Sequence, residues 1–102
     1  MTELPEALAA PSLETLREVH AASSELVRET PTVSSRSLSA EVGGAIVLKA
    51  ENLQRTGSFK IRGALAKLRS LDSGSCRGVV TGSAGNHAQS LAYAARSLGV
   101  PR

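Results

Sequence analysis

The feature that most constrains the fold is an alternation of short apolar runs with longer helical patterns. Residues 45–50 and 78–81 are short runs rich in β-branched side chains. Residues 59–71 and 86–98 carry apolar side chains at the three- and four-residue spacing of a helix with one buried stripe. Strands that alternate with helices of this length are typical of βαβ units. We therefore predict an α/β fold with an open parallel sheet.

Capping and turn residues mark the ends of the predicted elements. A first helix is predicted to begin after a Ser12 cap and to end before Pro31, because the residue before a proline is pushed out of the helical region. Gly99 is predicted to end the last helix. Residues 1–11 are expected to form a flexible tail, and residues 12–99 then contain helix, strand, helix, strand and helix.

Composition narrows the class of protein. The chain has 102 residues and only 2% aromatic residues, so its core is expected to consist of small and aliphatic side chains. One cysteine, Cys76, excludes an intrachain disulfide and a four-cysteine zinc site, and no metal site is predicted. No apolar stretch is long enough to span a membrane, and the first ten residues lack the basic start of a secretory signal. A cytoplasmic protein that does not bind membranes is expected.

The net charge of +3 is unevenly distributed. Residues 55–77 hold six basic residues and one acidic residue, whereas residues 1–30 hold six acidic and two basic residues. A basic cluster is one property of nucleic-acid-binding proteins, so a small basic nucleic-acid-binding module is one interpretation. The chain lacks an aromatic platform and any recognised nucleic-acid motif, which favours the prediction that no nucleic acid is bound.

The loop over residues 51–58 follows the first predicted strand and leads into Phe59 and Lys60. Ligands of open parallel sheets bind beyond the carboxyl ends of the strands. The start of a helix disfavours a positive charge and so favours a neutral amine, which can form a Schiff base with an aldehyde. From position alone, Lys60 is more readily explained as a solvated helix lysine, and Phe59 as either a core residue or a ring stacked on a flat cofactor.

The loop after the second predicted strand contains small residues and then a polar pair. Small residues let a backbone approach a ligand closely, and amides at a helix N-terminus bind a phosphate or a carboxylate. Asn86 is interpreted as a helix cap or a ligand contact, and a lone His87 is more often structural than catalytic. The loop is neither a dinucleotide fingerprint nor a P-loop.

Together, the two loops resemble the motifs of one known family. The stretch LKAENLQRTGSFKIRGA (residues 48–64) resembles the lysine motif of the threonine/serine dehydratases, which are pyridoxal-phosphate enzymes of the tryptophan-synthase-β fold type, fold type II. The stretch SAGNHAQ (residues 83–89) resembles the second motif of the same family, in the expected order and at the expected distance. The resemblance covers roughly residues 13–102. It implies that residues 1–102 are a single N-terminal fragment of the catalytic domain, and therefore an incomplete part of that fold.

The resemblance also implies a cofactor and a role for each motif residue. Lys60 is similar to the lysine that forms a Schiff base with pyridoxal phosphate and then removes the substrate Cα proton. Phe59 resembles the residue packed against the pyridine ring, and Asn86 the asparagine that hydrogen-bonds the 3′ oxygen of the ring. The loop that binds the substrate carboxylate is represented by Ser83, Ala84, Gly85, Asn86 and His87. The implied reaction removes the β-hydroxyl of L-threonine or L-serine and gives a 2-oxo acid and ammonia, as in isoleucine biosynthesis.

Two differences from the family pattern affect these expectations. Members that racemise serine tend to have a second serine where this sequence has Ala84, so elimination is favoured over racemisation. The glycine-rich phosphate loop of the family lies further along the chain, so the 102-residue fragment is expected to be inactive alone and the full-length enzyme to be a homo-oligomer. Threonine synthase, a serine-specific dehydratase and a truncated product without activity of its own are the alternatives within the family.

Overall fold

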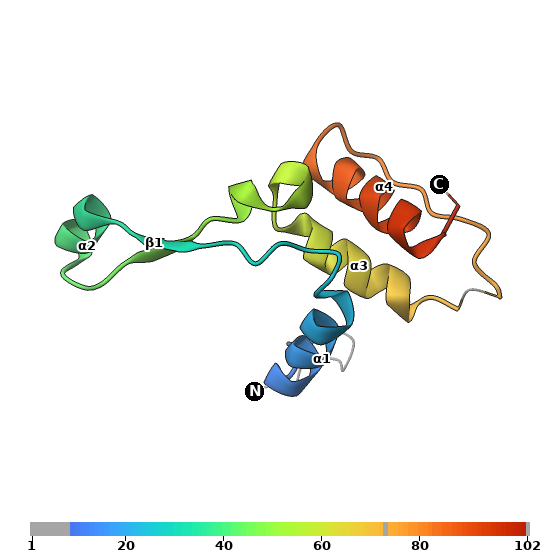
Figure 1. The fold of residues 1–102 in the computed structure, drawn as a ribbon, viewed down its shortest axis with the longest axis horizontal. Coiled ribbons are helices and arrows are strands. Elements are labelled where there is room, and N and C mark those ends of the chain that lie inside the picture. The colour runs from blue at the N-terminus through green and yellow to red at the C-terminus, as the bar shows by residue number, and fades with distance from the viewer. Residues whose placement is uncertain (1–8, 73, 102) are drawn as a thin grey trace.

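The computed structural model describes residues 9–72 and 74–101 (Figure 1). Most of the predicted flexible tail, residues 1–11, lies outside these described residues. Helix α3 lies between α1 and α4, and an arm made of β1, α2 and β2 extends away from the three helices. The elements are α1 (Leu13–Ser23), β1 (Thr32–Ser34), α2 (Arg36–Val42), β2 (Val47–Lys49), the 3₁₀ turns η2 (Glu51–Leu53) and η3 (Arg55–Gly57), α3 (Lys60–Ser70) and α4 (Asn86–Leu98).

The core lies where α3 packs against α4. The apolar stripe predicted for α3 is confirmed from Ile61 to Leu68, where its members are buried, whereas Leu71 follows the helix and is partly buried. Two alanines of α4 are fully buried against the stripe. Small alanine side chains let the two helix backbones approach each other closely. No helix among the described residues is both long and apolar enough to cross a membrane. The buried core residues are Val27, Ile61, Ala64, Leu65, Leu68, Ala94 and Ala95.

The sheet differs from the prediction. β1 pairs with β2 in an antiparallel ladder, with Val33 opposite Leu48. Residues 78–81 are not assigned as a strand, and the amide of Val79 donates to the Pro101 carbonyl at 2.9 Å. The strand predicted over residues 78–81 therefore does not form among the described residues, and the two strands that do form are antiparallel. A strand needs a neighbouring backbone to take up its hydrogen bonds, and β1 is that neighbour for β2.

The first helix begins as predicted and ends early. The Ser12 hydroxyl caps α1, but the helix ends at Ser23 rather than before Pro31. Serine is a weak helix former, and the chain turns there, with the Leu26 amide donating to the Ser23 carbonyl at 2.9 Å. The turn directs the buried Val27 toward α3, so its apolar character reflects core packing outside a helix.

The arm contains elements that the sequence pattern does not predict. The serine-rich stretch between β1 and α2 starts a short helix, because the Ser35 hydroxyl accepts a hydrogen bond from the Leu38 amide at 3.3 Å. Gly43 ends this helix in the left-handed conformation at φ 68°. Gly99 ends α4 in the same way at φ 70°, as predicted.

Candidate active site

The N-termini of α3 and α4 lie at the same end of the helix pair, because the two helices run in the same direction (Figure 1). Lys60 is the first residue of α3 and Asn86 is the first residue of α4. The two loops that the sequence singled out therefore meet at one place. Their meeting depends on the packing of α3 on α4.

A groove of about 340 Å³ lies between the two helices and the segment 79–81. Lys60 and His87 both line it, and Lys67 lies further along α3. The remaining lining is largely apolar, with leucines and alanine from the facing sides of the helices. A primary amine and an imidazole in a mostly apolar groove form a site suited to a small molecule that reacts with the amine.

Phe59 lies apart from this groove. Phe59 is 63% exposed, and it lines a separate hollow of about 710 Å³ together with Glu51 and Arg62. The structure therefore brings Lys60 and His87 together but places Phe59 at a different surface. The stacking of Phe59 on a cofactor ring stays a prediction.

The loop over residues 83–87 forms the start of α4. The Ser83 hydroxyl accepts hydrogen bonds from the amides of Gly85 and Ala88, both at 3.3 Å. Gly85 is the cap residue, so the side chain of Asn86 stands on the first helical turn and does not cap the helix. Gln89 donates the first backbone bond of the helix, to Gly85. Within the described chain, the amides of Asn86 and His87 have no such bond, and an anion can accept from them.

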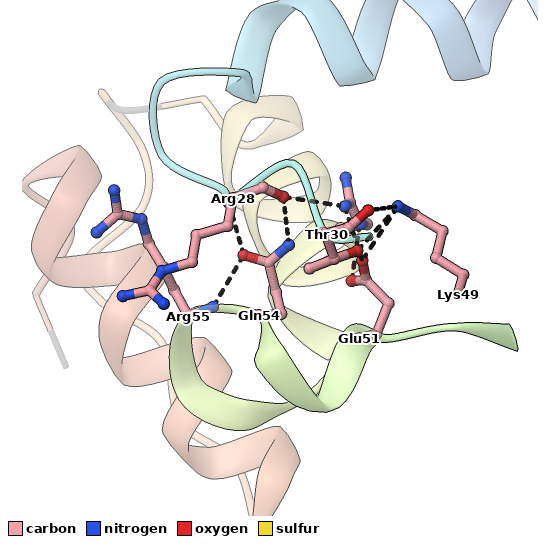
Figure 2. Close-up of polar contacts among 7 residues, drawn as sticks. Arg28, Thr30, Lys49, Glu51, Gln54 and Arg55 are labelled. Carbon is pink, nitrogen blue, oxygen red and sulfur yellow. Dashed lines mark hydrogen bonds and ion pairs between the residues drawn. The ribbon is translucent and has the colours of Figure 1, made fainter. Parts of the chain in front are cut away.

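A polar network lies beside the turn over residues 55–60 that leads into Lys60, which we call the lysine turn (Figure 2). No role was assigned to this network from the sequence. Arg62 donates from Nε to Glu51 Oε2 at 3.0 Å and from Nη2 to Glu51 Oε1 at 2.9 Å. The Thr30 hydroxyl also donates to Glu51, and Lys49 Nζ donates to the Thr30 carbonyl at 3.0 Å. The hydrogen bonds from Arg62, more than those from Thr30, lower the pKa of Glu51 from 4.5 to about 2. The same ion pair raises the pKa of Arg62.

Gln54 joins the same network to the segment before β1 (Figure 2). Gln54 is only 4% exposed. Its Oε1 accepts from the amides of Arg28 at 2.7 Å and Arg55 at 2.8 Å, and its Nε2 donates to the Arg28 carbonyl at 2.8 Å. Three members of the network lie inside the stretch 48–64, namely Glu51, Gln54 and Arg62. Membership of that motif was the sequence signal that could have identified them.

The class of protein follows from comparison with known families. The family described as "Pyridoxal-phosphate dependent enzyme" matches residues 23–102, a range that contains Lys60 and the loop at the start of α4. The chain belongs to this family. The predicted resemblance is confirmed, and so is pyridoxal phosphate as the cofactor of the family.

Individual relatives differ in the reaction that their names give. The L-threonine ammonia-lyase of Thermotoga maritima is 48% identical over 91 residues, which cover 88% of this chain and 23% of the relative. The L-threo-3-hydroxyaspartate ammonia-lyase of Pseudomonas sp is 53% identical over 73 residues, covering 71% of this chain and 23% of the relative. The crystal structure of serine racemase from Dictyostelium discoideum matches with a TM-score of 0.79 at 39% identity, over 90% of this chain and 31% of that chain.

These matches confirm the fold prediction at the level of the fold type II enzymes. This chain spans about a quarter of the length of the curated relatives that it matches.

The residues at the groove fit the chemistry of pyridoxal phosphate. The cofactor presents an aldehyde, which a primary amine such as that of Lys60 can bind. Two positions earlier, the hydroxyl of the buried Ser58 has no hydrogen-bond partner within the described residues. A buried polar atom of this kind is costly without a partner, so this hydroxyl is an unused hydrogen-bonding group two residues before the lysine.

Proposed function

We propose that the complete gene product containing this chain removes the β-hydroxyl of L-threonine or a similar β-hydroxy amino acid and releases a 2-oxo acid and ammonia. The observation that carries this proposal is the placement of Lys60 and His87 along one groove, at the adjacent N-termini of α3 and α4. Two ammonia-lyases of β-hydroxy amino acids among the relatives support it.

Each residue of the two loops has a part in the proposal. When bound, pyridoxal phosphate supplies the electron sink for the chemistry at the substrate Cα. The Lys60 amine would hold the cofactor at its carbonyl carbon and would take the proton from the substrate Cα. The amides of Asn86 and His87, within the loop 83–87, bind the substrate carboxylate. The Asn86 side chain would contact the ring oxygen. Phe59 lines a separate hollow, so its packing against the ring stays a prediction of the family resemblance.

Racemisation is the second candidate, because a serine racemase is among the similar structures. Racemisation requires a proton donor on the opposite face of the substrate from Lys60. Ala84 stands where racemases of the family tend to have a serine, and a methyl group cannot donate a proton. The proposal therefore favours elimination over racemisation. It also includes a cytoplasmic homo-oligomer that takes part in isoleucine biosynthesis.

An assay of the complete gene product tests the proposal. The purified protein is supplied with pyridoxal phosphate and, separately, with L-threonine, L-serine and L-threo-3-hydroxyaspartate, and the 2-oxo acid and ammonia are measured. We expect both products in equal amounts, a loss of at least about a thousandfold in Lys60→Ala, and little change in Lys67→Ala, which removes the other lysine of the groove. Formation of D-serine without a 2-oxo acid would contradict elimination.

A further inference from the structure

We propose that Thr56 is a positioning residue for Lys60, and that its hydrogen bond to Ser90 couples the lysine turn to the loop at the start of α4. The inference rests on the proposed function, because it explains how two separate segments keep a shared geometry. Thr56 lies in η3, which contacts α4, and it precedes Lys60 by four residues. Ser90 follows Asn86 by the same number, one helical turn further along α4.

The backbone of Thr56 is strained. Its φ of 67° and ψ of 4° place it in the left-handed region, where it stands as the described chain's one non-glycine residue with positive φ. A β-branched side chain is strongly disfavoured there. Gly57 follows at φ 75°, a conformation that glycine adopts freely. The turn thus requires two consecutive left-handed residues, and a strained residue persists only where its surroundings hold it.

The hydroxyl of Thr56 supplies that restraint. Thr56 Oγ1 lies 3.2 Å from Ser90 Oγ, and Ser90 is fully buried. The Gly57 amide closes the same turn by donating to the Gln54 carbonyl at 2.8 Å. Loss of the Thr56 hydroxyl leaves the Ser90 hydroxyl buried without this partner, which is unfavourable, and releases the turn toward an unstrained conformation.

Release of the turn changes the place of Lys60 relative to the loop 83–87. Lys60 begins α3 directly after the turn, and the loop 83–87 leads into α4. The Thr56–Ser90 contact therefore connects the two segments that contain the site residues. Reaction rates depend steeply on such placement, and a shift of about 1 Å can cost a large factor. The strain at Thr56 is therefore explained by the geometry that it maintains.

The test uses four variants of the complete gene product. Thr56→Val keeps the branched shape without the hydroxyl, Ser90→Ala removes the partner, and Thr56→Ser keeps the hydroxyl. Ser97→Ala removes an exposed hydroxyl from the same helix and is the control. The readout is the rate at which pyridoxal phosphate becomes reducibly bound to Lys60, measured by borohydride trapping and peptide mapping well below each unfolding temperature.

We expect the trapping rate to fall about fivefold or more in Thr56→Val and Ser90→Ala, and to stay within about twofold of the unsubstituted protein in Thr56→Ser and Ser97→Ala. If Thr56→Val does not fold, Thr56→Ala carries the same expectation, because alanine lacks the hydroxyl but is still disfavoured in the left-handed conformation. Unchanged trapping in the folded variants overturns this inference alone. Absence of a label on Lys60 in the unsubstituted protein overturns the proposed function, and the inference with it.

Discussion

The guanidinium of Arg62 donates two hydrogen bonds to the carboxylate of Glu51, at 3.0 and 2.9 Å, and so ties the loop before Lys60 to the helix that Lys60 begins. Paired bonds of this kind fix direction as well as distance. Thr30, from the segment before β1, and Lys49, from the end of β2, contact the same carboxylate (Figure 2). The lysine turn is thus held on one side by this network and on the other by the packing of α3 on α4.

The pH dependence of stability tests the state of Glu51. Its pKa in the folded chain is about 2, below its ordinary 4.5. A carboxyl with a lowered pKa stabilises the fold above its ordinary pKa and loses that contribution as the pH falls from about 4.5 to 2. We expect Glu51→Gln to lower the free energy of unfolding by about 2 kcal/mol at pH 7 and to reduce the loss of stability in that acid range. Urea unfolding at pH 7 and pH 3 measures both effects.

Glu41→Gln is the matched control for that experiment, because Glu41 is an exposed carboxyl on α2. A Glu51→Gln protein as stable as Glu41→Gln at pH 7, with an unchanged acid response, would contradict the assignment of the lowered pKa to the ion pair.

The geometry of the ion pair is tested at Arg62. Lysine carries the same charge but lacks the planar fork that reaches both carboxylate oxygens. We expect Arg62→Lys to cost about 1 kcal/mol and Arg62→Met to cost more, because methionine leaves the Glu51 carboxylate without its main partner. A double-mutant cycle of Arg62→Met with Glu51→Gln should give a coupling of about 1 to 3 kcal/mol. Additive effects of the two substitutions would show that the pair is energetically unimportant.

The role of Gln54 is tested by removing its amide. Gln54→Ala deletes three hydrogen bonds at a residue that is 4% exposed, and it leaves the amide and the carbonyl of Arg28 without these partners. We expect a loss of about 3 kcal/mol in unfolding free energy and faster hydrogen exchange at the Arg28 amide. Gln54→Glu keeps both acceptor bonds but not the donor bond. Its unfolding free energy should therefore lie between those of the unsubstituted protein and Gln54→Ala. Unchanged exchange at Arg28 in Gln54→Ala would refute the role.

The proposed preference for elimination over racemisation is tested at Ala84. A serine at this position would offer a proton on the opposite face of the substrate, as the family resemblance implies. We expect Ala84→Ser to raise D-serine formation from L-serine by at least about tenfold, measured by chiral chromatography. Ala92→Ser, an exposed change on α4, serves as the control and should form no additional D-serine. An equal yield from both variants would remove Ala84 as a determinant of the reaction.

The parts of the fold that sequence predicted well are those with a local signal. The stripe from Ile61 to Leu68 repeats over several turns, so burial of one helix face follows from spacing alone. The cap at Ser12 and the stop at Gly99 likewise depend on single residues with defined local roles. The residues of both site loops were recognisable because they form long motifs next to these helices.

The parts that sequence missed depend on contacts between distant residues. The pairing of Val33 with Leu48 joins two strands of three residues each, which are too short to show a period. The Glu51–Arg62 pair and the Thr56–Ser90 contact exist only once the chain has folded. The exposed position of Phe59, away from the groove of Lys60, could not be derived from its neighbours in sequence.

The identity of the lysine that binds pyridoxal phosphate is the most direct test of the account. The complete gene product is incubated with the cofactor, reduced with borohydride and digested, and the modified peptide is mapped by mass spectrometry. We expect one modified residue in this chain, Lys60, with loss of the label in Lys60→Ala. Modification of Lys67, which lines the same groove, or of Lys49 in place of Lys60 would contradict it.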